Sequence, residues 1–373
     1  MNRSSTRLSV VRRLPFIRKL LLLVVLCVLA LQGMPLPASA DAITARSAVV
    51  IDSATDKILY AKNPNWKLPP ASTTKLVTAM VALDRLSPDA VLTISPDAAN
   101  TPSVSPHLRP GERFVMRDIL ALALIRSVNG AAVALAEAAA GSEEAFVRLM
   151  NEKAAHLGAE NTHFINASGL PGPGQHITAF DLAKVMKESL KYPLVQESIG
   201  MRTKEIRSLE GRRLFVKNTN QLLWMNDECI GGKTGYTKAA RHCFVSASRK
   251  GDSTLITAVL GEPVRDELWG DSAALAAKGY DILDQKAEPM IYFTSSNETP
   301  IVLASYKTGK KSSRSKLVKG KQRGSAGRPK LSKEKGSKAD KAVKAVEKRS
   351  KKKKNGRVRV AGKGKKLPAR DIS

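Results

Sequence analysis

One stretch, residues 69–84, constrains this chain more than any other. It opens with two prolines, which cannot lie inside a helix, and continues with leucine and methionine at helical spacing. A buried amphipathic helix is therefore predicted to begin at Ser72 or Thr73. Ser72 and Lys75 then share one face. A serine hydroxyl needs a base within hydrogen-bond reach to act as a nucleophile, and a lysine kept neutral by burial or a second cation can be that base.

The spacing Ser-x-x-Lys is not specific by itself, because it recurs three times in the lysine-rich C-terminal part of the chain. Two other motifs distinguish the copy at Ser72. Ser127-Val128-Asn129 is predicted on a turn between two apolar helices, and Lys233-Thr234-Gly235 at the end of a strand. Both motifs also have second copies, but only the first copies lie within a domain that can pack a core.

The N-terminus reads as a secretory signal peptide over residues 1–40. Six Lys/Arg precede an apolar run from Leu20 to Leu31, and Ala38-Ser39-Ala40 follows as a cleavage site. The alternative is a membrane anchor, but twelve apolar residues fall short of the roughly 20 that span a bilayer. The chain is therefore expected to be exported, to the periplasm or another extracytoplasmic space, with a peripheral membrane association as one option.

The predicted mature chain keeps two cysteines, Cys229 and Cys243. They could face each other across a hairpin and form a disulfide, or they could be two unpaired, half-buried thiols, and both readings stay open. The sequence has neither a C-x-x-C nor an H-E-x-x-H motif, so no metal or other cofactor is expected. His176 opens a capped helix and is interpreted as structural.

The net charge of +29 is confined to the two ends of the chain. Residues 41–305 hold 29 basic and 29 acidic residues, whereas residues 306–373 hold 27 Lys/Arg and 4 acids. This tail has almost no aromatic residues and is predicted to be disordered. Export removes it from cytoplasmic nucleic acid, so its expected partner is an anionic lipid headgroup, lipopolysaccharide or another acidic envelope polymer. A solvated tail with no partner is the alternative.

The order of predicted elements indicates an α+β domain over residues 41–285. A strand hairpin opens the domain and the helix at Asp266–Leu283 closes it, so the first and last elements are expected to meet in one antiparallel sheet. Residues 286–305 are predicted to add two short strands. Other helices are predicted at 116–125, 131–140, 143–157 and 178–190, and other strands at 204–207, 213–217, 228–234, 244–249 and 254–260.

With these motifs in this order, the chain resembles the penicillin-interacting serine enzymes over roughly Ala45 to Leu283. It is most similar to the D-alanyl-D-alanine carboxypeptidases of the low-molecular-weight penicillin-binding class. Leu108–Glu112, Phe164–Asn166 and Asn218–Leu223 also look like stretches of that family. The resemblance implies a β-lactamase/transpeptidase-like fold, in which an antiparallel sheet is flanked by helices and carries an inserted helical subdomain.

The resemblance also implies a catalytic set. Ser72 would be the acylated nucleophile, Lys75 its base, and Ser127 the relay that carries the proton to the leaving amine. The backbone N–H groups of Ser72 and Tyr236 would form the oxyanion hole. These roles amount to a serine D,D-carboxypeptidase that removes the terminal D-alanine from peptidoglycan stem peptides through an acyl-enzyme and is inhibited by β-lactams.

The remaining residues of the motifs are expected to bind the substrate. By the same resemblance, Asn129 would hold the substrate amide and Lys75, while Lys233 and the Thr234 hydroxyl would bind the terminal carboxylate beside Gly235 and Tyr236. A free carboxylate needs a fixed cation for recognition. The charge of Lys233 would also help to keep Lys75 neutral.

Two other functions are compatible with the sequence. A serine β-lactamase would share the fold and motifs, and a catalytically idle protein could bind an envelope polymer through its tail.

The chain departs from the family pattern at Gly130, where an aspartate is frequent, at Gly232, where a β-branched residue is commoner, and at Arg241, where glycine is usual. Stem-peptide preference, oligomeric state and the balance between carboxypeptidase, endopeptidase and transpeptidase activity stay open.

Overall fold

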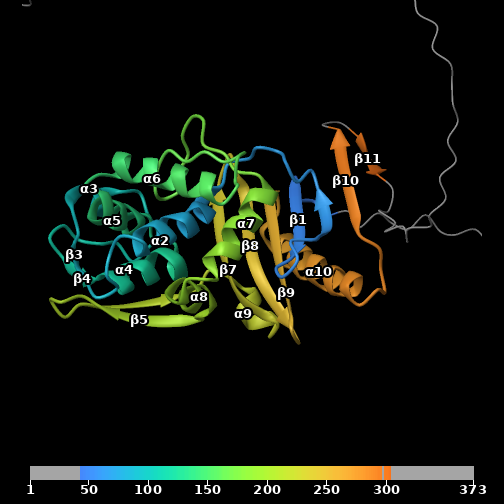
Figure 1. Ribbon diagram of the computed structural model, residues 1–373. Coiled ribbons are helices and arrows are strands. Elements are labelled where there is room, and N and C mark those ends of the chain that lie inside the picture. Colours follow the sequence, from blue (N-terminus) through green and yellow to red (C-terminus); the bar gives the residue numbers. More distant parts are fainter. Residues whose placement is uncertain (1–42, 296–297, 304–373) are drawn as a thin grey trace, which may run out of the picture. The chain divides into compact units, whose positions relative to one another are not determined.

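The computed structural model describes residues 43–295 and 298–303 of the chain. Its main sheet has the strand order β11–β10–β2–β1–β9–β8–β7 (Figure 1). Neighbouring strands are antiparallel except for β10 and β2, which are parallel. The strands span Ser47–Asp52 (β1), Ile58–Lys62 (β2), Cys229–Thr237 (β7), Arg241–Lys250 (β8), Ser253–Glu262 (β9), Met290–Ser295 (β10) and Glu298–Leu303 (β11).

Strand β1 joins the early and late parts of the sequence. It lies between β2 and β9, and its register pairs Ser47 with Leu260 and Asp52 with Leu255. Every residue of β1 is buried, because side chains on both faces of the sheet pack under helices. The predicted antiparallel sheet, formed from the first and last elements of the domain, is therefore confirmed.

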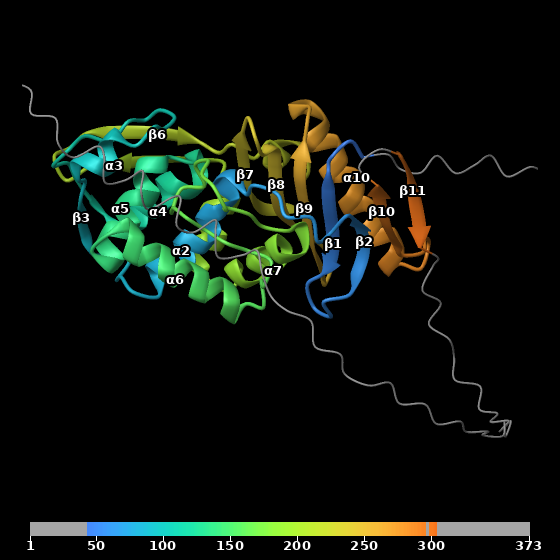
Figure 2. The same ribbon diagram turned by 90° about the horizontal axis from the view of Figure 1, so that it is seen from above.

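Helices cover both faces of this sheet (Figures 1 and 2). Leu268 and Trp269 of α10 pack on one face, where the Trp269 ring meets Phe244 edge to face with 5.3 Å between centroids. α2 and α7 contribute to the core on the opposite face. The helices span Ala71–Thr74 (η1, a 3₁₀ turn), Lys75–Leu83 (α2), Pro96–Asn100 (α3), Met116–Ala121 (α4), Leu122–Arg126 (η2, a π-helix), Asn129–Ala140 (α5), Glu143–His156 (α6), Ala179–Ser189 (α7), Pro193–Gly200 (α8), Leu222–Met225 (α9) and Arg265–Leu283 (α10).

A second group of helices, α3 to α6, is inserted between β2 and α7 together with the short strands β3 (Val91–Thr93) and β4 (Arg113–Val115). Local signals fix where these helices begin. Before α6, Gly141 has a φ of 80° and the Ser142 hydroxyl accepts a hydrogen bond from Ala145 N at 3.2 Å. The predicted helix at 143–157 is thus confirmed, one residue shorter at its end.

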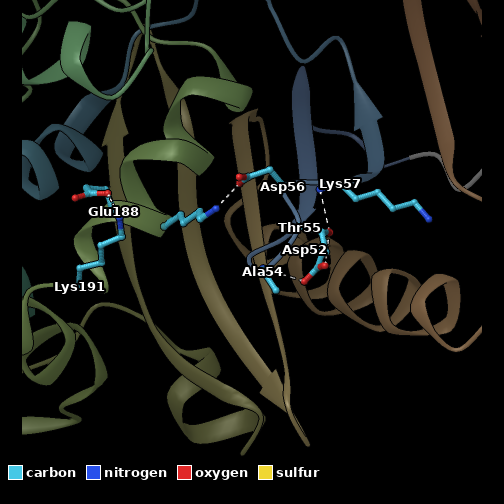
Figure 3. A network of polar contacts seen from close by, with 8 residues as sticks. Asp52, Ala54, Thr55, Asp56, Lys57, Glu188 and Lys191 are labelled. Carbon is cyan, nitrogen blue, oxygen red and sulfur yellow. Dashed lines mark hydrogen bonds and ion pairs between the residues drawn. The ribbon is translucent and has the colours of Figure 1, made fainter.

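The turn between β1 and β2 is held by its own side chains (Figure 3). Asp52 accepts hydrogen bonds from Ala54 N at 3.2 Å and from the Thr55 hydroxyl, and Asp56 adopts a left-handed φ of 58°. Lys187 of α7 pairs with Asp56 at 2.6 Å. An exposed ion pair contributes only about 0–1 kcal/mol, so the aspartate turn sets the shape of this hairpin and the ion pair adds little.

Several elements differ from the sequence predictions. The short helices α3, α8 and α9 were not predicted, since each is at most eight residues long and has too few turns for a periodic pattern. The hairpin of β5 (Thr203–Arg207) and β6 (Arg213–Lys217) is confirmed. Strand β7 runs on to Thr237, three residues beyond its predicted end. β10 pairs in parallel with β2, so residues 290–295 extend the main sheet.

Both described cysteines are free and buried, which excludes the disulfide reading. In the β7–β8 hairpin, Cys229 pairs with Ser248 and Cys243 pairs with Gly235. At about 3.3 Å per residue, the six-residue offset separates the two thiols by roughly 20 Å. Cys229 also packs in the core on the α10 side of the sheet, and Cys243 in the core on the α2 side.

The predicted signal peptide, residues 1–40, and the basic tail, residues 306–373, lie outside the described residues. The predicted domain boundaries therefore stay predictions. Within 43–295 and 298–303, none of the helices is both long enough and apolar enough to span a bilayer.

Candidate active site

Ser72 lies in the 3₁₀ turn η1, which leads directly into α2. The α-helix itself begins at Lys75, two to three residues later than predicted, because Ala71 adopts a left-handed φ of 47° after the two prolines and forces a tight first turn. The Thr73 hydroxyl donates to Pro70 O at 2.7 Å and stabilises this turn. Lys75 Nζ donates to Ser72 Oγ at 2.8 Å, so the predicted nucleophile and base are in direct contact.

Lys75 is fully buried. Besides Ser72, its Nζ donates to Asn129 Oδ1 at 2.7 Å and to the Ser168 carbonyl at 2.6 Å. Burial holds the pKa of Lys75 well below its usual range, and the charge of Lys233 lowers it further. Because these three acceptors are uncharged, none of them forms an ion pair that would favour the ammonium form. The site therefore favours the neutral amine, whose two N–H groups donate to Asn129 and Ser168 while its lone pair is left to accept the proton of Ser72.

Ser127 and Asn129 come from the junction between η2 and α5. Ser127 has a left-handed backbone, with φ 67° and ψ 31°, and Asn129 is the first residue of α5. The Asn129 side-chain nitrogen donates to Pro102 O at 2.7 Å, which leaves its oxygen for Lys75. The predicted turn between two apolar helices is confirmed, and it directs both side chains toward Lys75 and Lys233.

Lys233 lies within β7, the edge strand of the sheet, and not at a strand end as predicted. Its Nζ donates to Ser127 Oγ at 3.0 Å and to the Thr234 carbonyl at 2.9 Å. The side chain is fully buried, and burial lowers the pKa of Lys233 to about 7. The Thr234 hydroxyl lies 2.6 Å from that of Thr219.

Two glycines allow β7 and a neighbouring loop to approach η1 closely. A Cβ atom on Gly235 would lie 2.8 Å from Ser72 N, and one on Gly169, which has a φ of 82°, would lie 1.8 Å from Ala71 O. Backbone N–H groups in the first turn of a helix have no intrahelical acceptor. Ser72 lies in such a first turn, and its backbone N lies close to Gly235 of the edge strand β7, where Tyr236 is the next residue.

A cleft of about 480 Å³ opens over these groups. Six of the eight predicted residues line it: Ser72, Ser127, Asn129, Thr234, Gly235 and Tyr236. The other two, Lys75 and Lys233, are fully buried and reach the cleft only through their hydrogen-bond partners Ser72 and Ser127. The structure thus brings together all eight.

The sequence prediction missed several neighbours of this site. Thr219 contacts Thr234, Ser168 bonds to Lys75, and the cations Arg126 and Arg265 line the cleft. Of these four residues, only Thr219 had a sequence signal that could have identified it, since it lies in the stretch 218–223 that resembles the family. His176 is elsewhere: its Nδ1 lies 2.7 Å from Gly174 O.

Within the described part of the chain, no group of three or more His, Cys, Asp or Glu side chains could hold a metal ion. The cleft is lined by hydroxyls and backbone N–H groups, with the amines of Lys75 and Lys233 directly behind them. A serine next to a neutral lysine, with a second lysine behind it, is suited to acyl transfer.

Comparison with known proteins agrees with this reading of the cleft. The sequence model of a protein family described as D-alanyl-D-alanine carboxypeptidase matches residues 35–264. The chain is 37% identical over 222 residues to the D-alanyl-D-alanine carboxypeptidase DacF of Bacillus subtilis, covering 58% of this chain and 57% of that protein. It is 38% identical over 217 residues to a D-alanyl-D-alanine endopeptidase of Pseudomonas aeruginosa, covering 57% of this chain and 69% of the relative.

Solved structures show the same fold. A putative penicillin-binding protein homologue from Mycobacterium tuberculosis superposes with a TM-score of 0.62 and 32% identity, covering 66% of this chain and 97% of that one. The predicted α+β fold of the β-lactamase/transpeptidase type is thereby confirmed. The chain spans only about 57% of the length of the Bacillus relative.

Proposed function

The chain belongs to the D-alanyl-D-alanine carboxypeptidase family, and we propose that it hydrolyses the terminal D-alanyl-D-alanine bond of peptidoglycan stem peptides. The observation that carries this proposal is the 2.8 Å hydrogen bond between Ser72 and the fully buried Lys75. A neutral lysine at that distance has a lone pair to take the serine proton.

In the proposed acylation, Ser72 Oγ attacks the carbonyl carbon of the penultimate D-alanine while Lys75 takes its proton. The backbone N–H groups of Ser72 and Tyr236 stabilise the developing oxyanion. Ser127 Oγ accepts a hydrogen bond from Lys233, which leaves its own proton for the leaving nitrogen. The proton that Lys75 took from Ser72 then replaces it on Ser127, so both side chains return to their starting state. The C–N bond breaks, D-alanine departs, and a water molecule then hydrolyses the ester to restore Ser72.

The substrate carboxylate is proposed to bind at Thr234. The Thr234 hydroxyl is paired with the Thr219 hydroxyl, and Lys233 Nζ donates to the Thr234 carbonyl. Arg126 and Arg265 line the same cleft. A bound carboxylate would favour the charged form of Lys233, whose pKa of about 7 in the free site leaves it partly neutral at physiological pH.

A fluorescent penicillin and a diacyl-Lys-D-Ala-D-Ala peptide test this function together in the full chain. We expect covalent labelling that persists, together with release of free D-alanine, and neither from Ser72→Ala. Rapid loss of the label with penicillin turnover and no D-alanine release would instead identify a β-lactamase. Activity that is unchanged in Ser72→Ala would reject both enzymes and leave the polymer-binding reading.

We further propose that the protein is exported and that its tail, residues 306–373, holds it on an anionic envelope surface. The tail has 27 Lys/Arg against 4 acids, and each cation near such a surface contributes about 1 kcal/mol. The full chain should sediment with anionic vesicles at low salt and be released near 1 M salt, where the screening length is about 3 Å. Equal sedimentation of a chain that ends at residue 305 would reject the tail as the anchor.

A further inference from the structure

Of the three oxygens around Lys75 Nζ, the Ser168 carbonyl is the backbone group. A neutral amine has two N–H groups and one lone pair. When Asn129 Oδ1 and Ser168 O each accept one N–H, the lone pair is left facing Ser72 Oγ at 2.8 Å. If Ser168 O moved away, the amine could turn and present an N–H to Ser72 in place of the lone pair. The position of this carbonyl therefore decides whether Lys75 can accept the proton of Ser72.

The peptide group that carries the Ser168 carbonyl is fixed on its other side by Asn166. The N–H of Gly169 belongs to the same peptide plane as the Ser168 carbonyl, and it donates to Asn166 Oδ1 at 2.7 Å. Gly169 also packs closely on η1, since a Cβ atom there would lie 1.8 Å from Ala71 O. The loop therefore has little room in which to move this peptide plane away from Lys75.

Ala167, the residue before Ser168, is held by side chains from two helices. Glu143, the first residue of α6, accepts a hydrogen bond from Ala167 N at 2.8 Å. Thr78 of α2 donates to Ala167 O at 2.6 Å. Ala167 and Thr78 are fully buried, so a backbone atom that lost its partner here would stay unpaired. Because Thr78 and Lys75 belong to the same helix, these two bonds fix the loop directly relative to the base.

Glu143 differs from its neighbour Glu144 in the same turn of α6, because Glu143 is half-buried and Glu144 is exposed. Burial raises the pKa of Glu143, and the hydrogen bond from Ala167 N opposes that rise. Burial and the charge of Lys233 are what lower the pKa of Lys75. Glu143 therefore acts on the base through the loop and not through its charge. An amide oxygen in its place should hold Ala167 N as well as the carboxylate does.

We propose that Glu143 is a positioning residue for the acylation of Ser72. Its carboxylate holds the backbone of Ala167, and the loop then presents the Ser168 carbonyl to Lys75. The inference rests on the proposed function because it concerns the same proton transfer. Neither Glu143 nor Ser168 lines the described cleft. Loss of the Glu143 carboxylate should therefore slow the chemical step and leave the binding of substrate unchanged.

Acylation of the full chain by a fluorescent penicillin in stopped flow separates these two effects. Glu143→Ala should lower the maximal acylation rate about tenfold and leave the penicillin concentration for half of that rate unchanged within about twofold. Glu143→Gln keeps an acceptor oxygen and should stay within about twofold of the wild-type rate. Glu144→Ala, which removes a charge from the same first turn of α6, is the matched control and should acylate as the wild type does.

Thr78→Val tests the second bond to Ala167 with little change in side-chain volume. It removes the hydroxyl that donates to Ala167 O and should also lower the maximal acylation rate about tenfold, with the half-maximal concentration unchanged. Thermal melting checks that each variant is folded. If Glu143→Ala does not fold, Thr78→Val and Glu143→Gln still decide the question, and a folded Thr78→Val with the wild-type rate would contradict the role of the loop.

Amide hydrogen exchange tests the contact without any substrate. Exchange at Ala167 N should be about tenfold faster in Glu143→Ala and unchanged in Glu143→Gln and Glu144→Ala. A folded Glu143→Ala that acylates at the wild-type rate, or a Glu143→Gln as slow as Glu143→Ala, would overturn the proposal. Wild-type protein that is acylated by penicillin but releases no D-alanine would reject the carboxypeptidase alone, since the acylation rates of the variants test Glu143 independently.

Discussion

Lys75 and Lys233 are both fully buried in the same site, where burial lowers the pKa of Lys75 and the charge of Lys233 lowers it further. The proposed chemistry places opposite demands on the two lysines. Lys75 must be neutral to take the proton of Ser72, whereas Lys233 must be charged to attract a carboxylate. With a pKa of about 7, Lys233 is charged in about half of the molecules at neutral pH and in more of them below it, and in the charged form it favours loss of the proton from Lys75.

The role of Lys75 as base predicts the effect of two substitutions. Lys75→Met keeps the approximate volume and removes the amine, and Lys75→Arg introduces a group that does not lose its proton. Acylation by a fluorescent penicillin should slow by about 10²–10⁴ in both variants. Thermal melting checks that each variant is folded, and a folded Lys75→Met that acylates at the wild-type rate would show that another group is the base.

Removing Lys233 should move the pH dependence of acylation. Because its charge lowers the pKa of Lys75, Lys233→Met should raise that pKa. Less of the neutral base is then present at a given pH, so the rising limb of the kcat/KM profile for an uncharged ester shifts to higher pH. Lys57→Gln serves as the exposed lysine control. A profile that is unchanged in Lys233→Met would show that the two lysines are not coupled.

The same pair of lysines predicts a difference between substrates in the wild type. For a peptide with a free carboxylate, kcat/KM should fall as the pH rises through about 7, because Lys233 loses its charge in the free enzyme. For the matching peptide amide, this falling limb should be absent. Parallel profiles for the two substrates would remove Lys233 from carboxylate recognition.

Seven of the eight predicted site residues carry a local signal in the sequence, and the eighth, Tyr236, follows only from the resemblance to the family. Ser72 and Lys75 follow from helical spacing, and the motifs at 127–129 and 233–235 follow from their order along the chain. Lys75, however, also bonds to the carbonyl of Ser168, which lies 93 residues away. A backbone carbonyl has no residue type to recognise, so only the path of the folded chain could reveal that contact.

The pairing of strands is a second feature that local sequence signals do not predict. The period of alternation predicted β7 and β8, but not their register, and it is the register that separates Cys229 from Cys243. The path of the chain also places β10 parallel to β2, a pairing between distant segments with no local signature. Long elements with a clear period were predicted well, whereas helices of one or two turns were not.

Gly130 departs from the family pattern for a steric reason that can be measured. A Cβ atom there would lie 2.2 Å from Ala98 O, because α3 packs directly against the start of α5. Gly130→Ala should reduce the free energy of unfolding by about 1–3 kcal/mol. The matched control is Gly270→Ala in α10, where a Cβ atom would meet nothing within 4 Å and the helix should gain about 0.5–1 kcal/mol. Chemical denaturation measures the free energy of unfolding of both variants. A Gly130→Ala variant that is more stable than the wild type would contradict the close packing.

Arg241, where the family usually has glycine, adopts a left-handed φ of 60° at the start of β8. This conformation costs an L-residue about 1–2 kcal/mol, and the larger unfolded-state entropy of glycine offsets roughly 0.5–1 kcal/mol of any gain. Arg241→Gly should therefore raise the free energy of unfolding by about 0.5–1 kcal/mol. Arg241→Ala removes the same charge but keeps the strained φ, so it should bring no gain. If both variants are stabilised equally in chemical denaturation, the charge of Arg241 and not its backbone is the source of the cost.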